Sequence, residues 1–272
     1  MERQYQEEYV RARSVLLDAL AALGGHRASA ILVGAQAIYV HAGEATFGMT
    51  PYTTDADIAI DPRSLGETPP IEAAMSRAGF RQGEHPGIWL GTGNIQVDLL
   101  VPESVGGGGR RGARLKGHSK STARKVEGIE GALVENEIVS IGSLRAGDDR
   151  KFEIRVAGAS ALLVAKLHKL WERRDSPRRL ENKDAADVFR LLQALPTEKL
   201  VAGLAKLRSD PISATVSAHA LDFLQRLFGE ADLLGIMLVR AAVEGLDDPD
   251  VAAASCVELA KDLIQAASNL GR

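Results

Sequence analysis

The sequence predicts an α/β (α+β) protein in which a mixed sheet flanked by helices is followed by a C-terminal all-α helical bundle. Up to residue 157, short apolar segments alternate with longer amphipathic ones, whereas beyond residue 158 apolar side chains recur only at helical spacing. The length of 272 residues exceeds the usual size of one domain. We therefore expect a sheet domain over 1–157 and a helical domain over 158–272.

Periodicity and breakers define the elements of the sheet domain. A leading amphipathic helix stops at Gly24-Gly25, the second strand ends at Asp61-Pro62, and Gly79 closes a later helix. The turn around Gly91 to Gly93 is spaced to join two apolar segments into a hairpin. The expected elements are helix 2–23, strand 28–33, helix 35–41, strand 57–60, helix 71–78 and strands 87–90, 94–101, 137–141 and 152–156.

The helical domain is divided by residues that end helices. Pro196, Pro211, Gly229 and Pro249 separate its amphipathic segments, and Gly158 marks the expected domain boundary. The expected helices cover 159–174, 182–195, 197–207, 213–228, 233–244 and 251–270.

Composition excludes several classes of protein. Apolar residues make up 45% and charged residues 25% of the chain, which is typical of a globular protein and not of a disordered or fibrous one. Cys256 is the only cysteine, so an internal disulfide and a cysteine-based zinc cluster are excluded. The N-terminus lacks a signal-peptide pattern, and no apolar run reaches the roughly 20 residues of a membrane span. We expect a cytoplasmic protein without membrane contact.

A basic, glycine-rich loop is expected over 103–125. The net charge of −3 gives no overall attraction to nucleic acid, so any such contact must come from a local patch. This loop contains four consecutive glycines and, over 110–125, seven Lys and Arg residues with no acid and no aromatic residue. It is either a phosphate-binding segment for a triphosphate or an RNA backbone, or a mobile, solvated loop.

Two aspartates in the second strand indicate a metal site. Asp55 and Asp57 are two residues apart, so on a strand they point to the same face. Two such carboxylates repel each other unless a cation lies between them, and hard divalent metals bind oxygen ligands. The alternative is a pair of solvated loop carboxylates.

A third carboxylate and a glycine turn extend this pattern. Asp98 lies in an otherwise apolar strand, where it is either a third metal ligand or a residue on an exposed polar face. Gly34-Ala35 follows a strand and begins a helix, a place where backbone N–H groups and the helix dipole favour phosphate.

The order of strand, glycine turn, helix, Asp-x-Asp strand and single-Asp strand resembles the nucleotidyltransferase superfamily of the polymerase-beta type, over about residues 28–102. The resemblance implies a nucleotidyltransferase-type sheet and two magnesium ions, for which Asp55, Asp57 and Asp98 would be the ligands. Asp57 and Asp98 would be catalytic, Asp98 as the base. Gly34, Ala35 and Thr54 would bind the nucleotide.

The turn and the following loop depart from that family. Ala35 stands where the family has Gly or Ser, so a hydroxyl contact to phosphate is missing. The segment 43–53 is longer than usual, and we interpret it as an inserted loop over the active site. Thr53-Thr54 matches the threonine that commonly precedes the acidic pair.

The helical part is similar to the AbiEii and MenT toxin-type nucleotidyltransferases, through a helix lysine at Lys166 and the pair Lys183-Asp184. The similarity implies that Lys166 reaches a phosphate, that Asp184 or Asp187 steadies it, and that Lys183 and Arg174 bind the nucleotide. The alternative is a charged helix face with an i,i+4 pair between Lys183 and Asp187, worth about 0.3 kcal/mol.

Together these features predict a magnesium-dependent enzyme that moves a nucleoside monophosphate from a nucleoside triphosphate to a hydroxyl acceptor. The toxin-type resemblance implies an RNA 3′ end such as that of transfer RNA, bound through 110–125, and a cognate antitoxin. A small acceptor of the aminoglycoside type is one alternative. A catalytically inactive fold used for binding or regulation is another, and Ala35 favours it.

Overall fold

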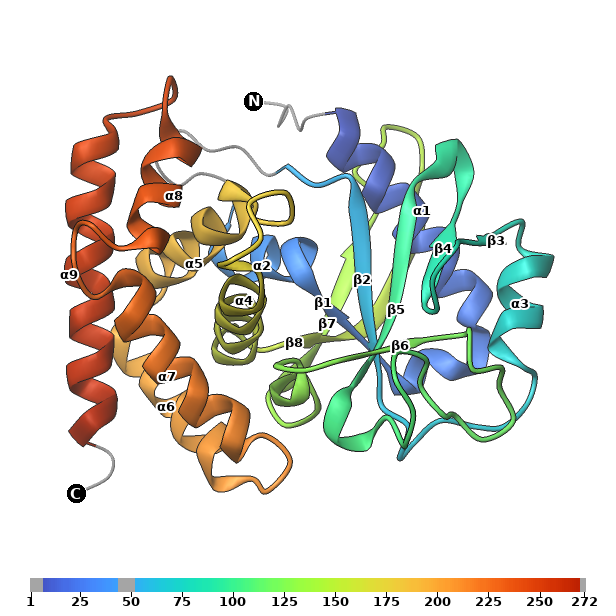
Figure 1. The fold of residues 1–272 in the computed structure, drawn as a ribbon. Coiled ribbons are helices and arrows are strands. Elements are labelled where there is room, and N and C mark those ends of the chain that lie inside the picture. The colour runs from blue at the N-terminus through green and yellow to red at the C-terminus, as the bar shows by residue number, and fades with distance from the viewer. Residues whose placement is uncertain (1–6, 44–51, 270–272) are drawn as a thin grey trace.

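The computed structural model describes residues 7–43 and 52–269 and confirms the predicted fold class (Figure 1). Its strands are β1 Ala30–Val33, β2 Asp55–Ile60, β3 Arg81–Gln82, β4 Ile88–Leu90, β5 Gln96–Pro102, β6 Arg124–Val126, β7 Asn136–Gly142 and β8 Lys151–Ala157. Its helices are α1 Glu7–Leu23, α2 Gly34–Ala42, α3 Ile71–Arg77, α4 Ala159–Arg173, α5 Asn182–Ala194, α6 Thr197–Ser209, α7 Ala214–Phe228, α8 Leu234–Val243 and α9 Pro249–Ser268.

The strands form one mixed sheet with the order β3-β4-β5-β2-β1-β8-β7, and β6 pairs with β5 beyond the end of β4. β2 runs parallel to β5 and antiparallel to β1, while β1 runs parallel to β8. The hairpin predicted from the glycine turn is present, because β4 pairs antiparallel to β5. The parallel pairing of β2 and β5 places the beginnings of both strands at the same level of the sheet.

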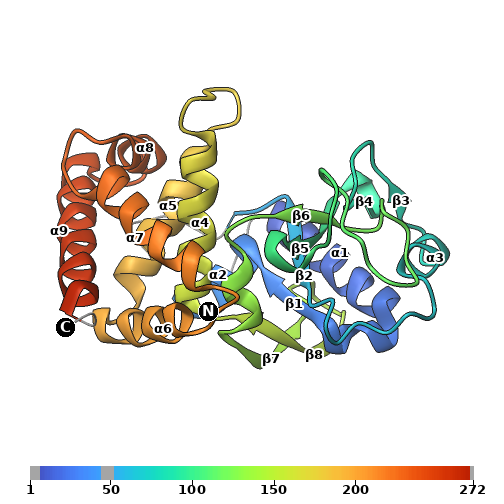
Figure 2. The same cartoon turned by 60° about the horizontal axis from the view of Figure 1, so that its bottom comes forward.

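Helices cover the sheet and then form a separate layer (Figures 1 and 2). α1 packs across β2, β5 and β8 and also contacts α3. α2 contacts β1 and β2 on one side and α4 and α5 on the other, so it joins the sheet to the helical bundle. The last strand ends at Ala157 and α4 begins at Ala159, where the sequence predicts the domain boundary. Buried apolar side chains of both parts nevertheless belong to one continuous cluster.

Each predicted helix is present in the structure. Only the first residues of the leading helix and the last residue of the final one fall outside the described residues 7–43 and 52–269. The first strand is shorter than expected because residues Gly24–Ser29 form a 3-10 helix before β1. β3 and β6 were not expected, since two or three residues are too few to show a period.

The basic loop differs from the mobile segment that the sequence allowed. Ala113, Leu115 and Ala123 are buried in it, and its end forms β6 along β5. Trp89 of β4 is 1% exposed, and its indole nitrogen donates to the carbonyl of Thr122 at 3.0 Å. Apolar side chains and backbone pairing therefore fix this loop to the sheet.

Two further expectations concern single features. Cys256 is free and buried, and burial raises the pKa of its thiol to about 12. Within residues 7–43 and 52–269, each helix falls short of the length and apolar character that crossing a membrane would need.

Candidate active site

Three carboxylates lie side by side at the beginning of β2 and β5. In the register of these parallel strands Asp57 is paired with Asp98, and Asp55 with Gln96. The neighbouring side chains Ala56, Ile58, Val97 and Leu99 point to the opposite face and are at most 1% exposed. Alternation along two strands thus gathers the acidic side chains on one face.

The turn from β1 into α2 lies against Asp57. Val33 ends β1 directly opposite Asp57, and Gly34 follows with φ of +69°. A Cβ atom at Gly34 would come within 2.1 Å of Oδ2 of Asp57. Both the backbone conformation and the space therefore require glycine here. Val33 at the N-cap of α2 forms no side-chain capping bond within the described residues, so the first backbone N–H groups of this helix are free of a cap beside Asp57.

The electrostatics of Asp57 reflect the crowding of negative charge. Burial, followed by repulsion from Asp55 and Asp98, raises the pKa of Asp57 to about 7, although Lys169 and Lys166 oppose the shift. A pKa this high indicates that the ionised carboxylate of Asp57 lacks a neutralising partner in the free protein. A cation bound between the three carboxylates would supply one.

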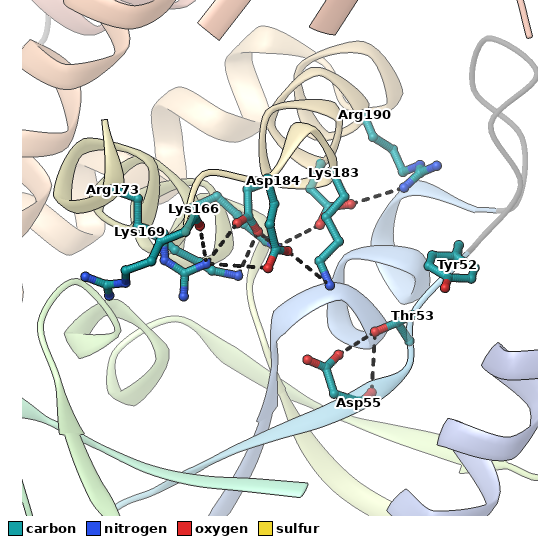
Figure 3. Close-up of polar contacts among 12 residues, drawn as sticks. Tyr52, Thr53, Asp55, Lys166, Lys169, Arg173, Lys183, Asp184 and Arg190 are labelled. Carbon is teal, nitrogen blue, oxygen red and sulfur yellow. Dashed lines mark hydrogen bonds and ion pairs between the residues drawn. The ribbon is translucent and has the colours of Figure 1, made fainter. Parts of the chain in front are cut away.

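Hydrogen bonds hold Asp55 from two directions. The hydroxyl of Thr53, which is fully buried, donates to Oδ1 of Asp55 at 2.6 Å (Figure 3). The amide of Gln36 donates to the backbone carbonyl of Asp55 at 3.0 Å, and Arg13 donates to Gln36 at 2.8 Å. α1 and α2 thereby fix the start of β2.

Asp98 is bound by an arginine of the basic loop. Its side chain is buried, accepts a hydrogen bond from Gln96 at 2.8 Å and forms an ion pair with Arg124 of β6. The alternative of an exposed residue on a polar strand face is therefore wrong. In the part of the chain that the structure describes, no three His, Cys, Asp or Glu side chains are grouped closely enough to hold a metal ion as they stand. The carboxylate of Asp98 is turned to Arg124.

A buried ion network joins α4 to α5 opposite these carboxylates. The ammonium of Lys166 lies 2.7 Å from Oδ1 of Asp184 and 2.8 Å from Oδ2 of Asp187. Burial opposes the charge, yet Asp187 and Asp184 hold the pKa of Lys166 well above its usual value. Arg190 binds Asp187 at 3.2 Å and lies over the ring of Tyr39, whose hydroxyl contacts the backbone of Tyr52. The network therefore also supports the segment that leads into β2.

Two other lysines interact with the acidic side chains of β2. Lys183 points from α5 toward Asp55 (Figure 3), and Asp55 and Glu181 raise its pKa although burial opposes them. Lys169 binds Asp184 at 2.9 Å and interacts with Asp57, while burial and Lys166 lower its pKa. Their side chains are 34% and 33% exposed, against 8% for Lys166. The accessible positive charge opposite the carboxylates is that of Lys169 and Lys183.

The comparisons with known proteins decide the family. A family model described as Nucleotidyltransferase matches residues 11–209, which is more than half of the chain. The chain belongs to this nucleotidyltransferase family. No curated protein and no solved structure matches it. The match extends from α1 to the end of α6 and so includes both the acidic strands and the lysines of α4 and α5.

Three residues predicted to bind the nucleotide, Arg174, Thr54 and Ala35, differ in their surroundings from Gly34 and Lys183. Arg174 stacks on Trp171, with its guanidinium carbon 4.1 Å from the ring centre, and donates to the carbonyl of that residue at 2.6 Å. Thr54 is exposed, and Thr53 makes the contact to Asp55. Ala35 is buried in the first turn of α2. Of the predicted inserted loop, residues 44–51 lie outside the described part of the chain.

The helix face expected as an alternative is wrong in its pairing. Lys183 pairs with Glu181 at 3.4 Å, and Asp187 pairs with Lys166 and Arg190. Sequence reasoning missed Lys169 as a candidate site residue. It noted Thr53 before the acidic pair and Arg124 in the basic loop, but assigned neither a contact with an aspartate. Lys169 could have been found, because it lies one helical turn after Lys166 on α4. Arg124 had no such signal, since its contact with Asp98 depends on the pairing of β6 with β5.

Proposed function

We propose that the protein transfers a nucleoside monophosphate from a nucleoside triphosphate to a hydroxyl acceptor, with magnesium as the cofactor, and releases pyrophosphate. The observation that carries this proposal is the placement of three carboxylates beside the Gly34 turn and opposite Lys169 and Lys183. Family membership supports nucleotidyl transfer. The arrangement combines ligands for a divalent cation with positive charge for phosphates.

The donor set suits magnesium. Asp55, Asp57 and Asp98 offer only hard oxygen ligands, and the raised pKa of Asp57, caused by burial and by repulsion from Asp55 and Asp98, supports the binding of a cation at this carboxylate. A pair of bound magnesium ions would stabilise the negative charge that develops on the reacting phosphate and make the acceptor hydroxyl easier to deprotonate. Asp55 and Asp57 would hold both ions, and Asp98 would hold the one on the acceptor side.

The remaining chemistry belongs to side chains of the chain. The acceptor oxygen forms a bond to the α-phosphorus, the bond from that phosphorus to the bridging oxygen breaks, and pyrophosphate leaves. Asp98 accepts the proton of the acceptor hydroxyl. Lys169 and Lys183 bind the triphosphate, together with the backbone N–H groups after Gly34.

Lys166 and Asp184 act in this proposal as positioning residues. Lys166 is already bound by two carboxylates and is 8% exposed, so its charge serves to hold Asp184 and Asp187. Asp184 in turn binds Lys169. Lys166 and Asp184 therefore fix the position of Lys169, the lysine proposed to bind phosphate.

Ala35, where the family has Gly or Ser, is compatible with an active protein as well as with an inactive one. Because Ala35 occupies the first turn of α2, it still contributes a backbone N–H to the turn. An inactive binding module remains the alternative that the missing hydroxyl favours, and a small aminoglycoside-type acceptor remains an alternative within the enzyme class. An RNA 3′ end such as that of transfer RNA and a cognate antitoxin, supported by the AbiEii and MenT resemblance, are the finer parts of the proposal.

Labelling with each of the four α-³²P nucleoside triphosphates tests the proposed function. We expect magnesium-dependent transfer of label from one or more of them to bulk RNA, and no transfer when the metal is chelated. Aminoglycosides in a parallel reaction test the small acceptor. An absence of label in both acceptors, together with an absence of nucleotide binding by calorimetry, would refute the proposal.

Replacing Lys183 by methionine tests the assignment of the triphosphate site. Loss of a charged hydrogen bond to phosphate is expected to raise KM for the nucleotide by about ten-fold, with a smaller change in kcat. Steady-state kinetics at varied nucleotide concentration measure both constants. Lys199, which is exposed on α6, provides the matched control Lys199→Met. A fall in kcat at unchanged KM would contradict a role in binding.

A further inference from the structure

A second positively charged site lies in the basic loop, apart from Lys169 and Lys183. A cavity of about 360 Å³ is lined there by Arg110, Arg114, Lys120 and Ser121, with Gly109 and Gly112 in its wall. Among the residues that the structure describes, none that lines it is acidic. Three cationic residues and a serine therefore stand around it, and their N–H and O–H groups are of the kind that bind phosphate oxygens.

Three of the loop's four other cations already have partners. Arg124 pairs with Asp98, Lys116 with Glu67, and Lys125 with Glu103. Across the described residues, no ion pair engages the three cations of the cavity, Arg110, Arg114 and Lys120. Arg111 is exposed and likewise has no ion pair among the described residues, so three of the loop's four unpaired cations line this cavity.

The wall of the cavity is held in place. Lys125, whose side chain is 6% exposed, donates to the carbonyl oxygens of Gly107 and Gly109 at 3.2 and 2.7 Å. Gly107 and Gly109 have φ of +72° and +110°, which glycine adopts readily. The glycine run is thus shaped around one buried ammonium, and the cavity is formed before any ligand binds.

The cavity adjoins the acceptor side of the proposed active site. Gly112 forms a β-bridge to Arg124, and the guanidinium of Arg124 binds Asp98. The lysines assigned to the triphosphate lie on α4 and α5, which contact α2, whereas the cavity belongs to the segment that pairs with β5. Positive charge therefore stands on both sides of the carboxylates, and one side is already assigned to the nucleotide.

We infer that this cavity binds a backbone phosphate of a single-stranded nucleic acid whose terminal hydroxyl is the acceptor at Asp98. The inference rests on the proposed function and specifies its acceptor as a nucleic-acid strand. Aromatic residues are missing from 103–125, so the site has no platform on which to stack bases. Binding at the cavity is therefore electrostatic and independent of base sequence.

The test compares two doubly substituted proteins in binding assays that need no catalysis. Arg114→Ser/Lys120→Ser removes two cations of the cavity, and Lys199→Ser/Arg208→Ser removes two exposed cations of α6. The probe is a fluorescein-labelled single-stranded RNA of roughly 12 nucleotides, measured by anisotropy between about 50 and 200 mM salt. Calorimetry with a nucleoside triphosphate is carried out on the same proteins.

We expect the cavity variant to bind RNA about ten-fold more weakly and to lower the slope of log K against log salt by about 0.7 per cation removed. Its affinity for the nucleotide stays unchanged, and the α6 variant keeps both affinities. The inference is overturned if the wild-type protein binds no RNA, if both variants lose RNA binding equally, or if the cavity variant loses none. Loss of nucleotide affinity in the cavity variant would assign the cavity to the triphosphate and would also overturn it. RNA binding is measured without turnover, so a failure of the labelling experiment is read separately.

Discussion

Asp57→Asn is expected to abolish nucleotidyl transfer and to stabilise the fold. Loss of the shared metal ligand should lower kcat by about a thousand-fold or more, because this carboxylate would bind both ions. The same substitution removes a charge that burial, Asp55 and Asp98 disfavour. An inactive protein that is harder to unfold is an outcome that general disruption of the fold would not produce.

The gain in stability should depend on pH. The pKa of Asp57 is about 7 in the folded protein and about 4 in the unfolded chain, so between these values the folded state binds more protons. The stability that this group contributes is fully present below about pH 4 and is lost as pH rises through about 7. Asp57→Asn lacks this loss, and the variant should exceed the wild type by about 2 kcal/mol at pH 8 and by little at pH 4.

Denaturant unfolding at pH 4, 6 and 8, without divalent metal, measures this dependence. Glu153→Gln on β8 is the matched control, because its side chain is exposed and lies outside the acidic cluster. Added magnesium should reduce the difference between wild type and Asp57→Asn, since the ion neutralises the wild-type site. Equal stability of the two proteins at every pH would show that the carboxylates do not repel one another as described.

Lys166→Met is expected to have the largest effect on stability. It removes the ammonium that lies between Asp184 and Asp187, whose side chains are 1% and 4% exposed. Asp184 keeps Lys169 and, at 3.8 Å, Arg173, and Asp187 keeps Arg190, so we expect a loss of about 3 kcal/mol, the lower end for breaking a buried ion pair. For a chain of 272 residues that corresponds to a fall in Tm of roughly 5 °C.

The substitution should also respond to acid and to a second substitution. Despite burial, Lys166 and Lys169 hold the pKa of Asp184 well below its usual range, so the stability from this group is present above about pH 4 and lost as pH falls through its folded pKa. The deficit of Lys166→Met should therefore be constant above about pH 4 and shrink as pH falls below it. Adding Asp184→Asn to Lys166→Met should recover part of the lost stability at pH 7, because the carboxylate left with too little positive charge is then gone.

Lys206→Met, on an exposed position of α6, is the control and should change stability by no more than about 0.5 kcal/mol. An equally large loss of stability in Lys206→Met would show that Lys166, with its two aspartates, contributes no more than an exposed lysine.

Much of the fold followed from the sequence because the signals were local. Apolar spacing and the breakers Gly24, Gly79 and Pro196 defined helices that the structure confirms. The two-residue alternation along 55–57 and 96–98 placed Asp55, Asp57 and Asp98 together on one face once β2 and β5 paired in parallel. Periodicity could predict which face of a strand each side chain takes.

The remaining features depended on contacts between distant segments. Arg124 reaches Asp98 across 26 positions in the chain, through a strand of three residues that has no periodic signal. Lys166 and Lys183 looked equivalent in sequence, yet helix packing buries the first between two carboxylates and leaves the second near Asp55. Which cation is structural and which is accessible is decided by tertiary packing.

The pairing of Arg124 with Asp98 makes cation uptake at this carboxylate an exchange and not a simple addition. A guanidinium already neutralises Asp98, so the free protein never carries the full charge of three aspartates. If a divalent ion displaces that guanidinium, the local charge rises by one unit instead of two, and a positive side chain is released beside the phosphate cavity of the basic loop. Metal occupancy and attraction for a polyanion would then increase together, so that either ligand promotes the binding of the other.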